Sequence, residues 1–71
     1  MINQGQVFQE EIQRLVNEKL PDKCRNIFIL SRIEGKSNPE IAELLDLSIR
    51  TVENQIYRAI KILKKNLNNY L

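Results

Sequence analysis

The polar side chains that could do chemistry in this sequence are concentrated near its C-terminal end, in the stretch SIRTVENQIYRAIKILKK, residues 48–65. Arg50, Asn54, Tyr57 and Lys61 follow one another at spacings of four, three and four residues, which places them on one face of an α-helix. Arginine and asparagine side chains have the hydrogen-bonding geometry that recognises guanine and adenine edges in the major groove of DNA. These residue types at this spacing therefore point to contacts with bases and phosphates.

The opposite side of the same segment is apolar. Because no glycine or proline interrupts the pattern, we predict one long helix from about Ile49 to Asn68, with Ser48 as its N-cap. A charged helix face is often only a solvated surface. Taken alone, this face is equally consistent with a solvated surface and with a surface that contacts DNA. The apolar residues predicted to face the core are Val52, Ile56, Ala59, Ile60, Leu63 and Leu67.

The sequence offers little that could support catalysis or hold a metal ion. It has no histidine and a single cysteine, Cys24, so neither a nucleophile–base pair nor a Cys/His metal cluster is available. It also lacks a glycine-rich loop that could hold a phosphate group. Cys24 is better explained as a small core residue than as a redox sensor. We therefore expect no enzymatic activity, no catalytic residue, no metal and no cofactor.

Charge is distributed unevenly along the 71 residues, which carry a net charge of +2. Residues 1–47 have a net charge of −2, and residues 48–71 have a net charge of +4. Such an asymmetry is typical of a nucleic-acid-binding surface near one end of a chain. No apolar run approaches the ~18 residues of a membrane span, and no signal peptide is recognisable. We expect one cytoplasmic domain that does not insert into membranes.

Two helices are predicted before residue 35. Apolar residues at helical spacing predict the first helix over residues 6–19. A second helix should start near Pro21, because proline is well tolerated in the first turn, and Gly35 should end it. We predict that the core includes Phe8, Phe28, Ile41, Leu45, Leu47, Val52 and Ile56.

A third, short helix precedes the long basic one. Ser37 and Glu40 have the spacing of a capping box, and the helix should end near Asp46. A short helix, a tight turn and a longer helix form a helix-turn-helix, whose second helix enters the major groove while the first crosses the DNA backbone. We predict an all-α, four-helix domain with a C-terminal helix-turn-helix over residues 6–71, after a disordered start at residues 1–5.

The stretch LPDKCRNIFILSRIEGKSNPEIAELLDLSIRTVENQIYRAIKILKKNL resembles region 4 of bacterial sigma factors of the sigma-70 family, and the extracytoplasmic-function (ECF) group is the nearest. The resemblance extends over about residues 6–68, nearly the whole chain, and implies a winged-helix-like fold of the sigma region 4 type. No single motif is decisive, but the ordered set is fairly specific. The matching residues are Leu20-Pro21, Arg25, Phe28-Ile29-Leu30, Glu34-Gly35, Glu40-Ile41-Ala42, Leu45, Ser48, Thr51-Val52, Ala59 and Leu63.

The resemblance implies a function in transcription initiation. Region 4 of this family binds the promoter −35 element as double-stranded DNA and docks on the flap of the RNA polymerase β subunit. An anti-sigma factor masks it in many ECF members, and the family favours a monomer. The DNA-facing candidates that the resemblance implies are Arg50, Thr51, Glu53, Asn54, Tyr57, Arg58 and Lys61, with Lys36 and Ser37 near phosphates at the start of the preceding helix.

A complete ECF factor also carries region 2, which melts the −10 element, and this chain has no room for it. We expect a domain cut from a longer protein rather than a stand-alone relative, and we expect that the isolated domain does not initiate transcription.

Two alternatives to the sigma interpretation remain. The stretch GKSNPEIAELLDLSIRTVENQI would also suit a LuxR-type output domain of a transcription regulator, although that family usually shows a Leu-Thr-x-Arg-Glu start where this chain has Leu20-Pro21-Asp22-Lys23-Cys24-Arg25. The other alternative is a protein-interaction module that binds no DNA. Glu53 on the outer face would weaken attraction to phosphates, although its carboxylate could accept a hydrogen bond from cytosine.

Overall fold

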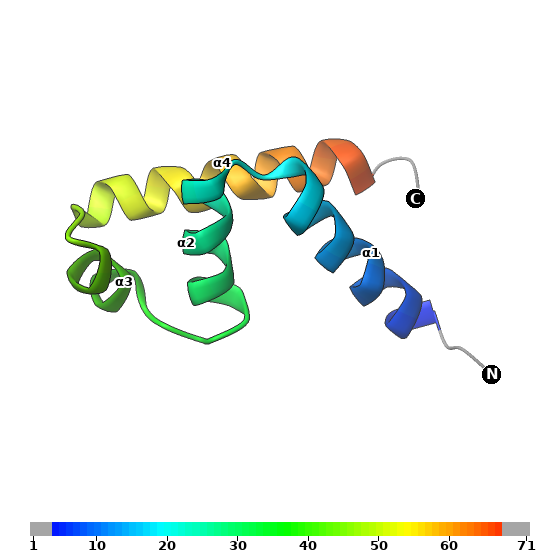
Figure 1. Ribbon diagram of the computed structural model, residues 1–71, viewed down its shortest axis with the longest axis horizontal. Coiled ribbons are helices and arrows are strands. Elements are labelled where there is room, and N and C mark those ends of the chain that lie inside the picture. The colour runs from blue at the N-terminus through cyan, green and yellow to red at the C-terminus, as the bar shows by residue number, and fades with distance from the viewer. Residues whose placement is uncertain (1–3, 68–71) are drawn as a thin grey trace.

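The computed structural model consists of helices joined by short connections (Figure 1). It describes the backbone of residues 4–67 and the side chains of residues 10–67, and this part of the chain contains no β-strand. The prediction of an all-α, four-helix domain is confirmed. In chain order the helices are α1 (Gln4–Lys19), α2 (Asp22–Arg32), α3 (Asn38–Leu45) and α4 (Ile49–Leu67).

The predicted helix boundaries differ from the observed ones mainly at the start. Gln4 and Gly5 lie in α1, whereas residues 1–5 were predicted to be a disordered start. Residues 1–3, Asn68 and the side chain of Phe8 lie outside the described part, so the predictions made for them stay predictions.

Helix α4 is the element on which the other three pack. Figure 1 shows α4 running along one side of the molecule, with α1, α2 and α3 placed one after another along its length. Helix α2 also packs against α3. Of the six residues of α4 predicted to face the core, four are buried, namely Val52, Ile56, Ala59 and Leu63. The other two, Ile60 and Leu67, are partly buried and pack against the core.

The buried side chains form two clusters along α4. The first joins α1 and α2 to the C-terminal half of α4. The second joins α2 and α3 to its N-terminal half, and Ile60 packs against both. The members of the first cluster are Leu15, Val16, Leu20, Cys24, Phe28, Ala59 and Leu63, and those of the second are Ile27, Ile41, Ala42, Val52 and Ile56.

The predicted core is largely correct, with one clear exception. Phe28, Ile41, Val52 and Ile56 are buried, and Leu47 packs against the second cluster while remaining partly exposed. The prediction for Leu45 is wrong, because 37% of this residue is exposed. Leu45 is the last residue of α3, and Ile41 and Ala42 already fill the inward face of that short helix.

The connection from α2 to α3 requires a glycine. Gly35 has a φ of +70°, a conformation that costs other residues energy because their Cβ crowds the backbone. A Cβ built at Gly35 would meet no atom within 4 Å, so the backbone conformation and not a lack of space demands glycine. The N–H of Lys36, the next residue, donates to the carbonyl of Leu30 over 2.9 Å and folds the chain back toward α3.

The predicted capping box at the start of α3 is confirmed. The N–H of Glu40 donates to the hydroxyl of Ser37 over 3.3 Å, and the N–H of Ser37 donates to a carboxylate oxygen of Glu40 over 3.0 Å. The backbone hydrogen bond from Ser37, followed by that of its hydroxyl, holds the pKa of Glu40 below its ordinary value of 4.5.

Glu40 should make the stability of the domain depend on pH. Because its pKa is lower in the folded state, its stabilisation is complete above about pH 4.5 and is lost as the pH falls through the folded pKa. In Glu40→Gln the capping acceptor remains but cannot titrate, so the free energy of unfolding should fall less between about pH 6 and pH 3 than in the wild type. Urea unfolding followed by circular dichroism measures this difference.

The matched control is Glu43→Gln, which removes a carboxylate from the same helix outside the capping box. This variant should keep more of the wild-type pH dependence than Glu40→Gln does. If the two variants lose the same amount, the pH dependence does not arise from the capping box.

Candidate nucleic-acid interface

Hydrogen bonds of two hydroxyl groups stabilise the turn before α4. The N–H of Thr51 donates to the hydroxyl oxygen of Ser48 over 3.0 Å, which confirms Ser48 as the N-cap. The hydroxyl oxygens of these two residues also lie 2.8 Å apart, in hydrogen-bond contact. Ahead of the cap, Leu47 packs against the cluster that contains Val52, which is the arrangement of a hydrophobic staple. The direction in which α4 leaves the turn is therefore well defined.

The end of α3 contributes to the same turn. Asp46 has a φ of 55°, in the left-handed region that aspartate tolerates better than most residues. The N–H of Leu47 donates over 2.8 Å to the carbonyl of Ala42, which also accepts from the N–H of Asp46 at the helix end. Only Asp46, Leu47 and Ser48 separate α3 from α4, so the two helices are held as a helix-turn-helix.

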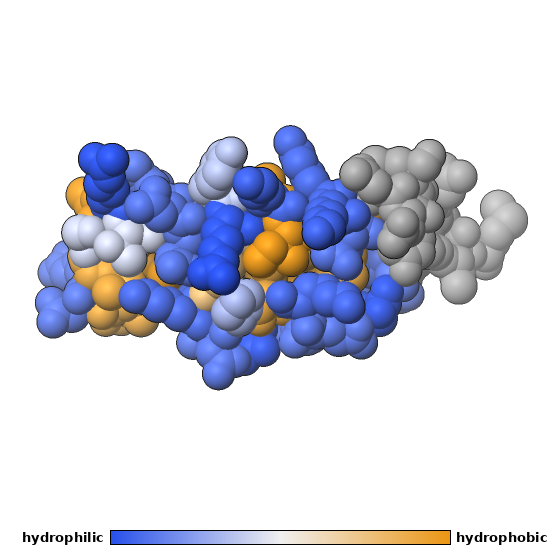
Figure 2. All heavy atoms as spheres, turned by 90° about the horizontal axis from the view of Figure 1, so that it is seen from above, coloured by the Kyte–Doolittle hydropathy of each residue, from blue (hydrophilic) through white to orange (hydrophobic). Residues whose placement is uncertain are grey.

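The outer face of α4 carries most of the residues that the sequence predicts to face DNA. Among the described residues, none of their basic side chains forms an ion pair with a carboxylate. Figure 2 shows the face that α4 presents as mostly hydrophilic, with apolar surface visible between charged side chains. The exposed members of the predicted set on α4 are Arg50, Glu53, Asn54, Tyr57, Arg58 and Lys61.

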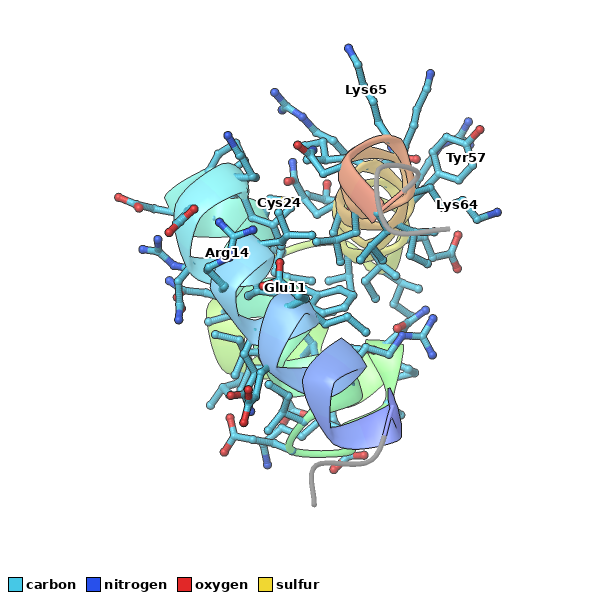
Figure 3. All side chains as sticks on the ribbon, turned by 90° about the vertical axis from the view of Figure 1, so that its right-hand side faces the viewer. Glu11, Arg14, Cys24, Tyr57, Lys64 and Lys65 are labelled. Carbon is cyan, nitrogen blue, oxygen red and sulfur yellow. The ribbon has the colours of Figure 1, made fainter. Side chains whose placement is uncertain are left out.

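Further along α4 the basic surface continues. Figure 3, which views the molecule nearly along this helix, shows Tyr57, Lys64 and Lys65 projecting from it on the side away from Arg14 and Glu11 of α1. Lys64 and Lys65 are exposed and lie in the last turn, where positive charge also suits the negative end of the helix dipole. Basic, amide-bearing and aromatic groups are thus gathered on one open helix face.

Three predicted site residues are engaged in local structure. Thr51 is partly buried and its hydroxyl contacts that of Ser48, so it positions the helix start. Ser37 is occupied by the capping box of α3. Lys36 is partly buried beside the carboxylates of Glu40 and Glu43, which reduce the positive potential there. The structure does not bring Lys36 and Ser37 onto the outer face of α4.

Ile49 was not among the residues that the sequence predicted to face DNA. It is the first residue of α4, and 45% of it is exposed. By helical spacing it lies on the side of α4 that carries Val52 and Ile56, three and seven residues further on, and not on the side of Arg50 and Asn54. Tyr57, which was predicted, is 69% exposed on the same half of the helix.

Cys24 contacts α4 on its buried side. Its side chain is fully buried, which confirms the prediction of a core residue, and its thiol donates a hydrogen bond to the carbonyl of Gln55 over 3.3 Å. Burial raises the pKa of the Cys24 thiol, and the positive charge of Arg58 opposes this effect. The thiol therefore stays protonated and can act as the donor.

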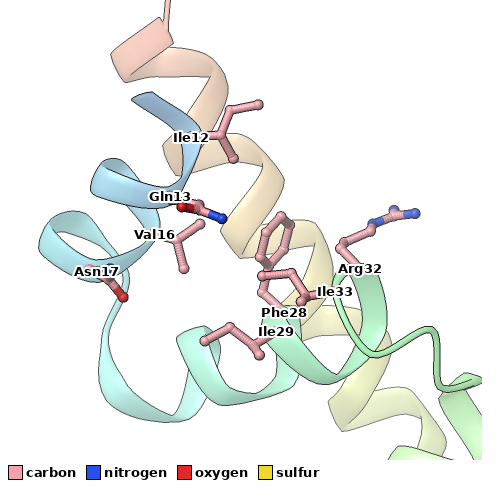
Figure 4. Close-up of a pocket in the computed structure, with 8 residues that line it drawn as sticks. All are labelled: Ile12, Gln13, Val16, Asn17, Phe28, Ile29, Arg32 and Ile33. Carbon is pink, nitrogen blue, oxygen red and sulfur yellow. The ribbon is translucent and has the colours of Figure 1, made fainter. Parts of the chain in front are cut away.

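A separate apolar groove lies between α1 and α2, with a volume of about 510 Å³. Figure 4 shows side chains of both helices converging on this space, with the guanidinium of Arg32 at its edge. Ile33, at the end of α2, is 61% exposed there. The lining residues of this α1–α2 groove are Ile12, Gln13, Val16, Asn17, Phe28, Ile29, Arg32 and Ile33.

The described residues contain no group of three or more His, Cys, Asp or Glu side chains that could hold a metal ion. None of the helices, over the residues described, is both long enough and apolar enough to cross a membrane. The outer face of α4 and the α1–α2 groove are two open surfaces of different chemistry, the first basic and the second mainly apolar.

Comparisons with known proteins agree with this geometry. Residues 9–63 match the family described as Sigma-70, region 4. The chain is 39% identical over 51 residues to the ECF RNA polymerase sigma factor SigW of Bacillus subtilis (strain 168). This alignment covers 72% of this chain and 27% of that protein. It is 27% identical over 67 residues to the ECF RNA polymerase sigma-E factor of Haemophilus influenzae. This second alignment covers 90% of this chain and 35% of that protein.

The chain therefore spans about a third, or less, of the length of these curated relatives. No solved structure matches it.

Replacing Ser48 with alanine should lower the free energy of unfolding by about 1 kcal/mol, because the N–H of Thr51 loses its capping acceptor. Ser48→Asp keeps an acceptor at this position and should remain close to the wild type. Thermal and urea unfolding of both variants measure the difference. Equal stability of Ser48→Ala and the wild type would show that the cap does not hold the start of α4.

Proposed function

The chain belongs to the region 4 family of sigma-70 factors, of the ECF type, and on that premise we propose that α4 recognises the promoter −35 element in the major groove. The observation that carries this proposal is the outer face of α4, where Arg50, Asn54 and Arg58 are exposed. Within the described part of the chain, neither arginine forms an ion pair with a carboxylate. The major groove admits a single helix, and these side chain types can reach base edges and phosphates from it.

Different parts of α4 would have different roles. The N-terminal part, with Arg50 and Asn54, would contact bases, because that end of the second helix enters the groove. Lys61, Lys64 and Lys65 lie farther along and would contact phosphates, which contribute affinity without reading sequence. Glu53 would restrict the set of bases accepted beside it, since a carboxylate accepts a hydrogen bond from cytosine and repels phosphate.

We further propose that the domain docks on the flap of the RNA polymerase β subunit through the α1–α2 groove. The groove is lined mainly by apolar residues, and no residue of the outer face of α4 contributes to it. Both surfaces could therefore be occupied at once, as a factor that brings polymerase to a promoter requires. An anti-sigma factor that covers either surface would block the activity.

A selection from randomised duplexes, with the domain alone at low salt, tests this function first. One short asymmetric motif would support a monomeric reader of the −35 element. A palindrome would instead favour the dimeric, LuxR-type regulator. An absence of enrichment, together with intact binding to a fragment of the β-subunit flap, would mean that the domain acts through protein contacts alone.

Arg50 and Lys64 should respond differently to truncation. Arg50→Ala should weaken binding to the selected duplex by about 1–3 kcal/mol and relax the preference at one base pair. Lys64→Ala should weaken binding to all duplexes alike and reduce the salt dependence by about one charge. Titrations of selected and scrambled duplexes at several salt concentrations separate the two effects. An unchanged base preference in Arg50→Ala would remove Arg50 from base readout.

The groove assignment is tested by placing a charge in it. Ile33→Glu should weaken binding to the flap fragment by about tenfold or more, because a carboxylate would be desolvated in an apolar contact. Leu44→Glu is the matched control, because it introduces the same charge at an exposed leucine. Leu44 is 60% exposed and does not line the α1–α2 groove. Calorimetry on the flap fragment and titration of the selected duplex measure both activities. Equal loss in the two variants would contradict the assignment.

A further inference from the structure

A second apolar groove lies between α2 and α3, two helices that pack against each other (Figure 1). We call it the α2–α3 groove, and its volume is about 270 Å³. Leu44 is 60% exposed there and Leu45 is 37% exposed, so a partner that filled the groove would remove leucine surface from water. The residues that line the groove are Asn26, Ile29, Leu30, Glu34, Leu44 and Leu45.

The surroundings of these leucines are acidic. Leu44 also lines a neighbouring hollow, together with Lys36, Glu40 and Glu43. With Glu34 of the groove itself, the combined surface has three carboxylates and one ammonium group, so its net charge is −2. All three glutamates are exposed and can therefore reach a partner. This surface is opposite in charge to the outer face of α4.

The charge decides which kind of partner can cover the leucines. Carboxylates repel the phosphates of nucleic acids and the headgroups of anionic membranes. A protein segment with apolar side chains flanked by lysine and arginine would instead bury the leucines and complement the carboxylates. An α-helix presents this arrangement when apolar residues recur three and four positions apart, and such a helix lies with its apolar face in a groove.

A second copy of the domain does not offer such a helix. Its basic helix is α4, and the apolar side of α4 is buried in its own core through Val52, Ile56, Ala59 and Leu63. The helix that fits the α2–α3 groove must therefore come from another protein.

We propose that the α2–α3 groove binds a basic amphipathic helix of a partner protein. Leu44 and Leu45 would contact the apolar stripe of that helix, and Glu34 and Glu43 would face the basic residues beside the stripe. The inference does not rest on the recognition of DNA by α4. The α2–α3 groove shares only Ile29 with the α1–α2 groove, so the domain would have a protein-binding surface besides the one proposed for the flap.

A display library tests the proposal without presupposing a particular partner. The probe is a library of randomised peptides of about 16 residues, roughly four helical turns. It is selected on the full 71-residue chain and counter-selected on Leu44→Ala. Peptides that depend on Leu44 should carry apolar residues at helical spacing and a net positive charge. The best of them should bind Leu44→Ala about tenfold more weakly than the wild type, because less apolar surface is buried.

Two further variants test the location and the charge of the site. Ile33→Ala is the matched control, because Ile33 is 61% exposed and lines the α1–α2 groove but not the α2–α3 groove. It should bind the selected peptide as the wild type does. The double variant Glu34→Gln with Glu43→Gln should weaken binding by about fivefold at low salt, and this loss should shrink at high salt. Circular dichroism establishes that each variant is folded.

Several results would overturn the proposal. These are a selection without any peptide that depends on Leu44, Leu44-dependent peptides that are acidic or lack helical spacing, and equal losses in Ile33→Ala and Leu44→Ala. Sedimentation that shows a dimer in the wild type and a monomer in Leu44→Ala would assign the groove to a contact between copies and would refute the proposal. Because no DNA enters these experiments, their failure leaves the proposed function standing, and a failed duplex selection leaves this inference standing.

Discussion

The packing of α3 and α2 against the start of α4 is the constraint on which the rest of the domain depends. Ile41 of α3, Ile27 of α2 and Val52 of α4 are all fully buried and belong to one cluster. In a chain of 71 residues without a disulfide, such contacts provide a large share of a small total stability. They also set the position of the helix that bears the candidate interface, so stability and function depend on the same side chains.

The angle of α4, in contrast, is specified locally at the turn. The left-handed Asp46, the packing of Leu47 and the cap at Ser48 follow one another within three residues. Each satisfies a backbone group or fixes a dihedral angle that would otherwise vary. Because the turn is defined by hydrogen bonds and the core by burial, the outer face of α4 is free to carry residues chosen for recognition rather than for folding.

These two sources of order explain what the sequence could and could not predict. Caps are local, so the capping box of Ser37 with Glu40 and the N-cap Ser48 could be recognised from the sequence alone. Burial depends on where a neighbouring helix ends, and spacing does not report that. Leu45 has the helical spacing of a core residue, yet it is exposed because α3 stops there and Ile41 already fills the contact.

Within the candidate site, the same limits apply. Arg50 and Asn54 could be placed on the outer face from periodicity, because α4 is long and regular. Periodicity could not predict that the Thr51 hydroxyl contacts Ser48 or that Ile49 is exposed, because both depend on the geometry of one particular turn. Periodicity identifies the face of a helix, whereas the extent of exposure at its ends is a tertiary property.

The distribution of charge gives the proposed interface a preferred direction of approach. Residues 48–71 carry a net charge of +4, whereas residues 1–47 carry −2. On α1, Arg14 is held by Glu11 over 2.7 Å and by Glu18 over 2.8 Å, so its charge is offset by two carboxylates on the side away from the basic face. A polyanion would therefore attract α4 and repel the opposite side of the domain.

Such steering brings α4 to the DNA backbone but cannot select a sequence, because phosphates are the same everywhere. In the proposed function, selection would come from the few polar groups at the start of α4, namely the guanidinium of Arg50, the amide of Asn54 and the carboxylate of Glu53. Each of these three groups prefers a different base-edge chemistry, so their fixed spacing on one helix would limit the number of sequences that satisfy all of them. A small basic domain can in this way combine general attraction to DNA with preference for a short site.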